Sequence, residues 1–290
     1  MTTPEPRPHD AGPDPYLRCL VATDLSARGD RALVRAFRLV SRGGGLVTVL
    51  HVVEDSYPSA ILKKIKEDVH IHLRQQITCM PESEGIYYRV EVESGRDCEV
   101  INERAAYHDL IVLGGRREPK LQDYVLSSTV QRVVRGASIP VLIVKTPYRG
   151  PYGFALAGLD EHPEAMRALT FALEACPEVR LLAFHAVDLP KIEATPENPT
   201  IQDEDGANAL LKDWVTPFSL RLEALPGFRE RGRVQGVVGS GPEALDRLCD
   251  DKTPDLLLFG RPHRSRSFFF GEDLPGYALM TKTHDILVVP

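Results

Sequence analysis

The sequence predicts two consecutive α/β domains, each built on a parallel β-sheet with helices on both faces. Three observations lead to this fold class. Short apolar runs alternate with stretches of helical period along the whole chain. The runs are nearly continuous in Val, Ile and Leu, which is typical of strands buried on both faces of a parallel sheet. The second half of the chain also repeats the pattern of the first half.

The internal repeat consists of five pairs of matching segments in the same order. The first pair opens each half, where an apolar run ends in Asp24 or Asp160 before a polar turn and a helical pattern. The other pairs are Thr48–Asp55 with Leu181–Asp188, Val90–Ile101 with Gln235–Leu245, Asp109–Arg117 with Asp255–His263, and Ser138–Lys145 with His284–Pro290. Strands alternate with helices in each half, which predicts a doubly wound, five-stranded sheet with right-handed crossovers.

The stretches between the strands carry apolar stripes at helical spacing. The first-half stripe comprises Ile61, Leu62, Ile65, Val69, Leu73 and Ile77. Its second-half counterpart comprises Ala207, Leu211, Trp214, Phe218, Leu222 and Leu225. Pro217 is expected to kink or restart that helix. The segment Pro190–Gly206 before it is acidic and rich in proline, and we expect a mobile loop.

Composition indicates the domain limits. Residues 1–16 are polar and proline-rich, which predicts a disordered tail. The two domains are expected at residues 17–146 and 151–290. The joint between them, Thr146–Gly150, is a short turn containing proline and glycine. Because the joint is short, the two domains should lie close together.

Charge and cysteine content narrow the expected partners. Apolar residues make up 43% of the chain, charged residues 26%, and the net charge is −6. This balance is that of a globular protein, and its acidity argues against nucleic acid as a partner. Five cysteines stand at long intervals without a metal spacing, which indicates reduced thiols, a cytoplasmic location and no metal site. No apolar run approaches the roughly 20 residues that cross a bilayer, so we expect no membrane partner.

The strand ends carry the candidate functional residues. Doubly wound sheets bind ligands beyond the carboxyl ends of their strands. The residues at these ends are Asp24, His51 and Gly114 in the first half and Asp160, His185 and Gly260 in the second. The aspartate and histidine pairs also have a structural interpretation, which we favour over a ligand contact. The aspartates can cap the following helices, and the histidines can pack beside the sheet.

These segments resemble the universal stress protein family. The resemblance rests on the aspartate at the tip of the first strand, Leu50-His51-Val52 in the second, the segment Gly95–Ile101 and the run Asp109–Gly114. It covers the chain from about Leu17 to Pro290, as two consecutive family domains. It implies the strand order 3-2-1-4-5 in each domain. It also implies that the halves pack as an intramolecular pseudo-dimer through their last strands, which would cover two apolar edges.

Nucleotide-binding members of this family carry the motif G-x2-G-x9-G-[ST] after the fourth strand. The glycines let backbone N–H groups approach phosphates, and the hydroxyl adds a donor at a helix N-terminus. The first half keeps the spacing with Gly114, Arg117, Ser127 and Ser128. Arg117 in place of the second glycine disfavours close backbone approach. The side chains of Arg116 and Arg117 could instead hold a phosphate.

The second half departs further from the motif. Gly260 is kept, His263 replaces the second glycine, and the loop to Gly271 is two residues shorter. Glu272 then stands where the motif has a hydroxyl, and its charge would repel a phosphate. In nucleotide-binding members the aspartate that matches Asp24 lies beside the nucleotide. By the same resemblance, Asp160 would be the second-half equivalent.

The sequence predicts a non-catalytic stress-response protein with degenerate nucleotide sites. It would act through protein contacts, with a homodimer partner or another protein, or through a small ligand. No phosphate-binding P-loop, nucleophile elbow or dinucleotide motif occurs, so no catalytic residue is assigned. The alternative is an ATP-binding regulatory switch, with slow hydrolysis, that uses the loop Gly114–Ser128. We expect that the protein requires no cofactor, and ATP is the one cofactor that the alternative would use.

Two further segments keep open alternatives. Cys98 stands at an expected helix start, where a thiol pKa can fall, and it would then be a redox sensor. The ordinary interpretation is a half-buried cysteine. The segment His263–Phe270 is basic and then aromatic. It is either a lid or partner-binding loop, or a loop whose phenylalanines pack on the neighbouring domain.

Overall fold

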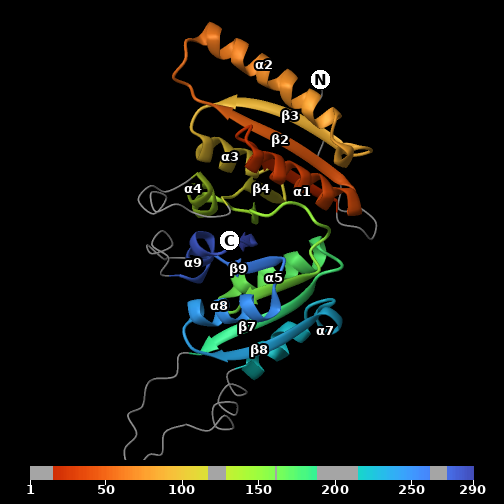
Figure 1. Ribbon diagram of the computed structural model, residues 1–290, viewed down its shortest axis with the longest axis vertical. Helices are drawn as coiled ribbons and strands as arrows, with labels where there is room; N and C mark the ends of the chain where they lie inside the picture. The colour runs from red at the N-terminus through yellow and green to blue at the C-terminus, as the bar shows by residue number, and fades with distance from the viewer. Residues whose placement is uncertain (1–15, 117–128, 161, 188–214, 262–272) are drawn as a thin grey trace, which may run out of the picture.

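The computed structural model describes residues 16–116, 129–160, 162–187, 215–261 and 273–290. One sheet of ten described strands runs through both halves of the chain (Figure 1). The expected tail 1–16, apart from Tyr16, and the segment Pro190–Gly206 lie outside the described residues.

The elements alternate as the sequence predicts. The first half contains β1 Leu17–Ala22, α1 Ala27–Gly43, β2 Gly45–Val53, α2 Ser59–Thr78, a 3-10 turn Pro81–Ser83, β3 Tyr87–Ser94, α3 Asp97–Ala105, β4 Leu110–Gly114, α4 Thr129–Gly136 and β5 Val141–Val144. The second half contains β6 Phe154–Gly158, α5 Pro163–Ala175, β7 Arg180–Val187, helical residues 215–223, α7 Phe228–Arg231, β8 Gly232–Val238, α8 Gly241–Lys252, β9 Leu256–Gly260, α9 Leu274–Thr281 and β10 Asp285–Val289. The predicted α/β fold class is confirmed.

The sheet order is β3-β2-β1-β4-β5-β10-β9-β6-β7-β8. The first half therefore has the expected order 3-2-1-4-5, and the second half repeats it in the opposite direction. All neighbouring strands are parallel except β5 and β10, which pair antiparallel with Leu142 opposite Leu287. Both strands are buried throughout. Their pairing covers two apolar edges that would otherwise invite association with other chains.

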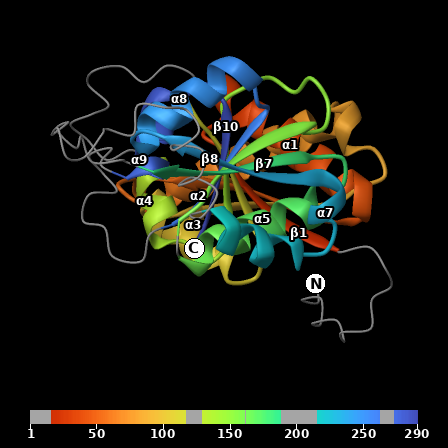
Figure 2. The same cartoon turned by 90° about the horizontal axis from the view of Figure 1, so that it is seen from below.

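Helices cover both faces of the sheet (Figure 2). On one face, α1, α2, α5 and α7 contribute to one hydrophobic core. On the other face, α3, α4, α8 and α9 contribute to a second core. Successive side chains of a strand point to opposite faces, so β5 and β10 contribute to both cores. Each core is therefore continuous across the junction between the halves.

The predicted apolar stripe on α2 is only partly buried. Leu73 and Ile77 are fully buried, whereas Ile61 is 50% exposed. Periodicity identifies the apolar face of a helix, but the neighbouring elements decide how much of that face is covered. In the second half, Phe218 and Leu222 of the expected stripe are buried, and Pro217 lies within helical residues 215–223.

A buried polar cluster joins the two halves. Asp285, at the start of β10, is fully buried. Its carboxylate accepts hydrogen bonds from the backbone nitrogens of Lys145 and Thr146, each at 2.8 Å, and from the Tyr152 hydroxyl at 2.7 Å. The Arg35 guanidinium of α1 lies 3.4 Å from the same carboxylate. Burial, then the charge of Asp285, raises the pKa of Tyr152 well above its ordinary value, so its hydroxyl remains a donor.

Each half also supplies a cation to a helix end of the other half. Lys145, directly after β5, donates from Nζ to the carbonyl oxygens of Leu279 and Lys282, both at 2.7 Å, at the end of α9. Arg261, directly after β9, donates to three carbonyl oxygens at the end of α4, those of Val134, Arg135 and Ala137. The last carbonyls of a helix lack partners within the helix and carry partial negative charge. These two contacts therefore hold α4 and α9 against the junction.

Candidate functional site

A cavity of about 570 Å³ lies beyond the carboxyl ends of the first-half strands. Its described lining comes from the ends of β1, β2, β4 and β5, the starts of α1, α3 and α4, and two residues of α9. Protein cavities that bind small molecules are typically of this size, and in doubly wound sheets they lie at this edge. This cavity is the candidate functional site.

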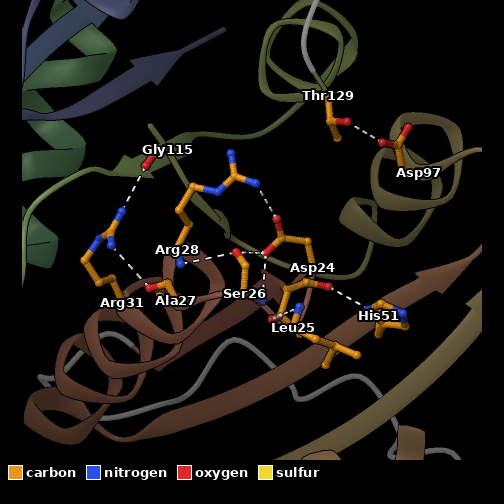
Figure 3. Close-up of polar contacts among 11 residues, drawn as sticks. Asp24, Leu25, Ser26, Ala27, Arg28, Arg31, His51, Asp97, Gly115 and Thr129 are labelled. Atoms are coloured by element: carbon orange, nitrogen blue, oxygen red, sulfur yellow. Dashed lines mark hydrogen bonds and ion pairs between the residues drawn. The ribbon is translucent and has the colours of Figure 1, made fainter. Parts of the chain in front are cut away.

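Asp24 lies at the tip of β1 within a local polar cluster (Figure 3). Its carboxylate accepts hydrogen bonds from the backbone nitrogen and hydroxyl of Ser26, and from the Arg28 guanidinium at 2.9 Å. The N-cap of α1 is Ser26, whose hydroxyl accepts from the Arg28 backbone nitrogen at 3.2 Å. Asp24 therefore does not cap α1 directly, contrary to the interpretation that we favoured. It positions the residue that does.

The pKa of Asp24 is lowered from its ordinary value. Burial alone would raise it, but the hydrogen bonds from Ser26 and the charge of Arg28 together outweigh burial. The carboxylate is thus ionised and engaged at neutral pH.

Gly114 is required by the packing of α1 on β4. A Cβ at this position would stand 2.4 Å from the carbonyl oxygen of Arg28. Gly260 has the same role in the second half, where a Cβ would stand 2.5 Å from the backbone nitrogen of Ala165. No side chain fits at either distance, so the first turn of each helix can only pack against a glycine. This contact gives both glycines a structural reason that does not involve a ligand.

The two strand-end histidines make equivalent contacts. His51 donates from Nδ1 to the carbonyl oxygen of Thr23 at 2.9 Å, and His185 donates to that of Leu159 at 3.1 Å. Each contact ties the end of a second strand to the loop after the first strand. This is the packing role expected from the sequence. His51 also lines the cavity.

The charged side chains that line the cavity are mainly cationic. Asp97, at the start of α3, accepts a hydrogen bond from the Thr129 hydroxyl and lies 3.6 Å from the Arg132 guanidinium. The charged side chains among the described lining residues are Arg28, Arg116, Arg132 and Lys145, with Asp24 and Asp97. Four cations against two carboxylates favour an anionic ligand. Arg117, Ser127 and Ser128 lie outside the described residues.

At the corresponding strand tip of the second half, Leu274 packs against Gly158. A Cδ atom of this residue lies 2.9 Å from the point where a Cβ on Gly158 would stand, at the tip of β6. Its other Cδ approaches Gly241, at the start of α8. Asp160 accepts a hydrogen bond from the backbone nitrogen of His162, which is the N-cap of α5. His263 and Gly271 lie outside the described residues.

Sequence reasoning did not include Lys145, Leu279 and Met280 in the site. All three line the cavity. Lys145 directly follows a fully apolar strand, and a cation at that place was the one available signal. Nothing in the local pattern of Leu279 and Met280 separates them from ordinary core residues, because a different half of the chain brings them to the cavity.

The fold is that of a doubly wound α/β protein, and its cavity lies at the strand ends, where this class of protein binds small ligands. Residues 15–145 match the model of the universal stress protein family. A universal stress protein of Mycolicibacterium smegmatis is 25% identical over 262 residues, covering 83% of this chain and 85% of the relative. Residues 15–145 therefore form a universal stress protein domain, and the chain as a whole is similar to a universal stress protein.

Solved structures show the same fold over nearly the whole chain. A universal stress protein from Archaeoglobus fulgidus DSM 4304 superposes with a TM-score of 0.71 at 17% identity, covering 94% of this chain and 96% of the other. A functionally unknown protein from Pseudomonas aeruginosa PAO1 has a TM-score of 0.59 at 17% identity, covering 94% and 92%. None of the helices in the described ranges is long and apolar enough to cross a membrane.

Proposed function

We propose that this protein acts without catalysis, by binding a small anion in the cavity of its first half. The second half then serves as a structural partner. The difference between the two strand-end positions carries this proposal. In the first half there is a cavity of about 570 Å³ whose charged side chains are mainly cationic. In the second half, Leu274 packs at the equivalent strand tip.

The pairing of the lining residues supports binding over catalysis. Asp24 is bonded to Ser26 and Arg28, and Asp97 to Thr129. A general base needs a pKa near the working pH, whereas the pKa of Asp24 is lowered. These carboxylates therefore fit a role in orienting cations.

The second candidate is an ATP-binding regulatory switch. It is favoured by Arg28 and Arg116, which line the same cavity and whose guanidinium groups could hold a phosphate. The contact of Gly114 with Arg28 weakens the sequence argument for this candidate, because packing alone accounts for that glycine.

We also propose that the halves, residues 17–146 and 151–290, form an intramolecular pseudo-dimer. The antiparallel pairing of β5 with β10 and the reciprocal contacts of Lys145 and Arg261 support it. A cytoplasmic location is supported by the five cysteines, all of which are free thiols. Other protein partners would then bind outside the junction.

Isothermal titration of the full chain with ATP and Mg²⁺ tests the nature of the ligand. Arg116→Gln is the informative variant, because Arg116 lines the cavity and is exposed. Arg149→Gln is the matched control, because Arg149 is exposed on the segment between the halves. If ATP is the ligand, we expect micromolar binding at one site, weakened roughly tenfold by Arg116→Gln and unchanged by Arg149→Gln.

The outcomes separate the candidates. No heat up to millimolar ATP would exclude the ATP switch and leave another small anion. Phosphate release above the buffer blank would overturn the proposal of a non-catalytic protein. If neither ATP nor the organic anion anilinonaphthalene sulfonate binds, the cavity is not a ligand site.

A further inference from the structure

We infer that the ligand of the first-half cavity is an elongated anion with an apolar part that lies against the second half of the chain. The inference rests on the proposed function, that this cavity binds a small anion. It adds that one wall of the cavity comes from the second half of the chain. The side chains of this wall indicate the chemical class of the ligand.

The wall comes from α9 of the second half. Leu279 and Met280 line the same cavity as Asp24 and His51. Leu279 is half-buried, so part of its side chain remains available to a ligand. The cavity is therefore incomplete without the second half.

The position of this wall is fixed by contacts across the junction. Lys145 donates from Nζ to the carbonyl oxygen of Leu279 itself, at 2.7 Å. The stem of Lys145 packs on the end of β4, since a Cβ at Gly115 would stand 2.9 Å from its Cγ and 2.5 Å from a methyl group of Ile143. Lys145 is thus a positioning residue: it holds α9 at the cavity while its own ammonium is engaged with α9 carbonyls.

The cavity extends along the sheet, with its two ends of different character. His51 lies on β2 and Ile143 on β5, and the strand order places β1 and β4 between them. Three strand spacings correspond to about 14 Å. Near β1 and β2 the charged pair Asp24 and Arg28, which Figure 3 shows, lies beside the apolar Ala22, Leu50 and Val52. At the β5 end the lining is apolar, with Ile143, Leu279 and Met280, apart from Lys145, whose ammonium is bonded to α9 carbonyl oxygens.

This distribution selects a class of ligand. A compact anion such as free phosphate would occupy only the charged end and leave the apolar end in water. A molecule with an acidic group near Arg28 and Arg132, and an aromatic or aliphatic part toward Leu279, would use both ends. Burial of that part against the wall contributes affinity that the charges alone do not supply.

The test uses anilinonaphthalene sulfonate, an anion with an apolar ring system, as the probe. The chain has four methionines, Met1, Met80, Met166 and Met280. With isotope-labelled methionine methyl groups in the full chain, we expect the Met280 resonance to shift as the probe saturates one site. Met80 and Met166 pack against the core of the opposite face and serve as internal controls. Met280→Leu assigns the resonance.

Fluorescence titration with two matched variants gives an independent readout. Leu279→Gln keeps the size of the side chain but makes the wall polar, and we expect it to weaken probe binding about fivefold. Leu220→Gln is the control, because Leu220 is 68% exposed on helical residues 215–223 of the same half. It should leave the affinity unchanged. If Leu279→Gln does not fold, the methionine readout on the unmodified chain decides.

The outcomes distinguish this inference from the proposed function. A Met280 shift together with weaker binding in Leu279→Gln supports the shared site. If ATP or the probe binds without moving the Met280 resonance, the inference is overturned and the proposed function stands. If neither molecule binds, both are overturned.

Discussion

Gly114 shows how one residue can be explained by the fold alone. It occupies the first position of a nucleotide-binding motif, yet the backbone of Arg28 leaves no room for a side chain. Gly260 repeats the contact in a half whose equivalent strand tip is packed by Leu274. The same backbone contact thus occurs in both halves, although their strand-end sites differ. The packing of the first helix on the sheet, which both halves share, therefore requires glycine at these two positions.

We therefore expect Gly114→Ala to destabilise the chain by about 1–3 kcal/mol through overpacking, whatever its effect on ligands. Urea unfolding measures this free energy. Gly153→Ala is the control, because a Cβ there would meet only Asp255, at 3.5 Å. Equal stability of the two variants would contradict the packing explanation.

Asp285 is the residue on which the junction depends most. Its buried carboxylate accepts hydrogen bonds from Lys145, Thr146 and Tyr152, and faces Arg35. An amide in its place would present an NH₂ donor to groups that are themselves donors. It would also leave the buried Arg35 guanidinium without its counter-charge. We expect Asp285→Asn to lower the free energy of unfolding by roughly 3 kcal/mol.

Denaturant unfolding of Asp285→Asn tests this expectation, with Asp68→Asn as the control. Asp68 is exposed on α2, and surface changes of this kind alter stability by about 0.5 kcal/mol or less. A loss for Asp285→Asn no larger than for Asp68→Asn would show that the cluster does not hold the junction.

At the scale of elements, α4 and α9 illustrate helices completed by the other half of the chain. Their last carbonyl oxygens are bonded by Arg261 and Lys145 respectively. These helices have eight residues each, too few to be stable alone. Their packing and their caps across the junction hold them in place.

Lys145 makes this contact dependent on pH. Burial, opposed by the charge of Asp285, lowers the pKa of Lys145 from 10.5 to about 8. Between these pH values the unfolded chain binds more protons than the folded chain, so the contribution of Lys145 to the free energy of unfolding rises with pH. We expect the free energy of unfolding of the unmodified chain, taken relative to that of Lys145→Met, to rise by ~1 kcal/mol per pH unit above pH 8.

Urea unfolding of both proteins at several pH values from neutral upward gives that difference. Lys63→Met is the control, since the Lys63 side chain is 82% exposed. Its difference from the unmodified chain should not vary across the window. A difference for Lys145→Met that stays constant or shrinks would mean that the folded state does not lower the pKa of this lysine.

At the scale of the whole molecule, the sheet and both cores pass through the junction without interruption. Leu142 of β5 and Leu287 of β10 belong to one core, and Ile143 and Ile286 to the other. Helices and strands that pack into the same core lose their contacts together when that core is disrupted. The two halves should therefore unfold as one unit.

A matched pair of variants tests this cooperativity. Leu33 on α1 and Leu169 on α5 are fully buried in the same core, one in each half. Leu33→Ala and Leu169→Ala should each cost about 2–5 kcal/mol and shift one common transition in denaturant. Two transitions, each moved by only one of the variants, would show that the halves unfold independently.

The sequence by itself determined the repeat, the fold class and the place of the ligand edge. Continuous apolar runs such as Val141–Val144 are typical of strands buried on both faces, and Asp24 and His51 were singled out by their positions at the ends of such runs. These features are local or repeat at fixed intervals, so they can be recognised along the chain.

Only the tertiary structure decided what each strand-end residue does and what completes the cavity. Leu279 and Leu274 lie five residues apart on one short helix, yet one lines the cavity of the first half and the other packs at the strand tip of the second. Their roles depend on the antiparallel pairing of β5 with β10, which brings distant segments together. Sequence periodicity specifies which side chains are buried, but the partner of each buried side chain is set by long-range packing.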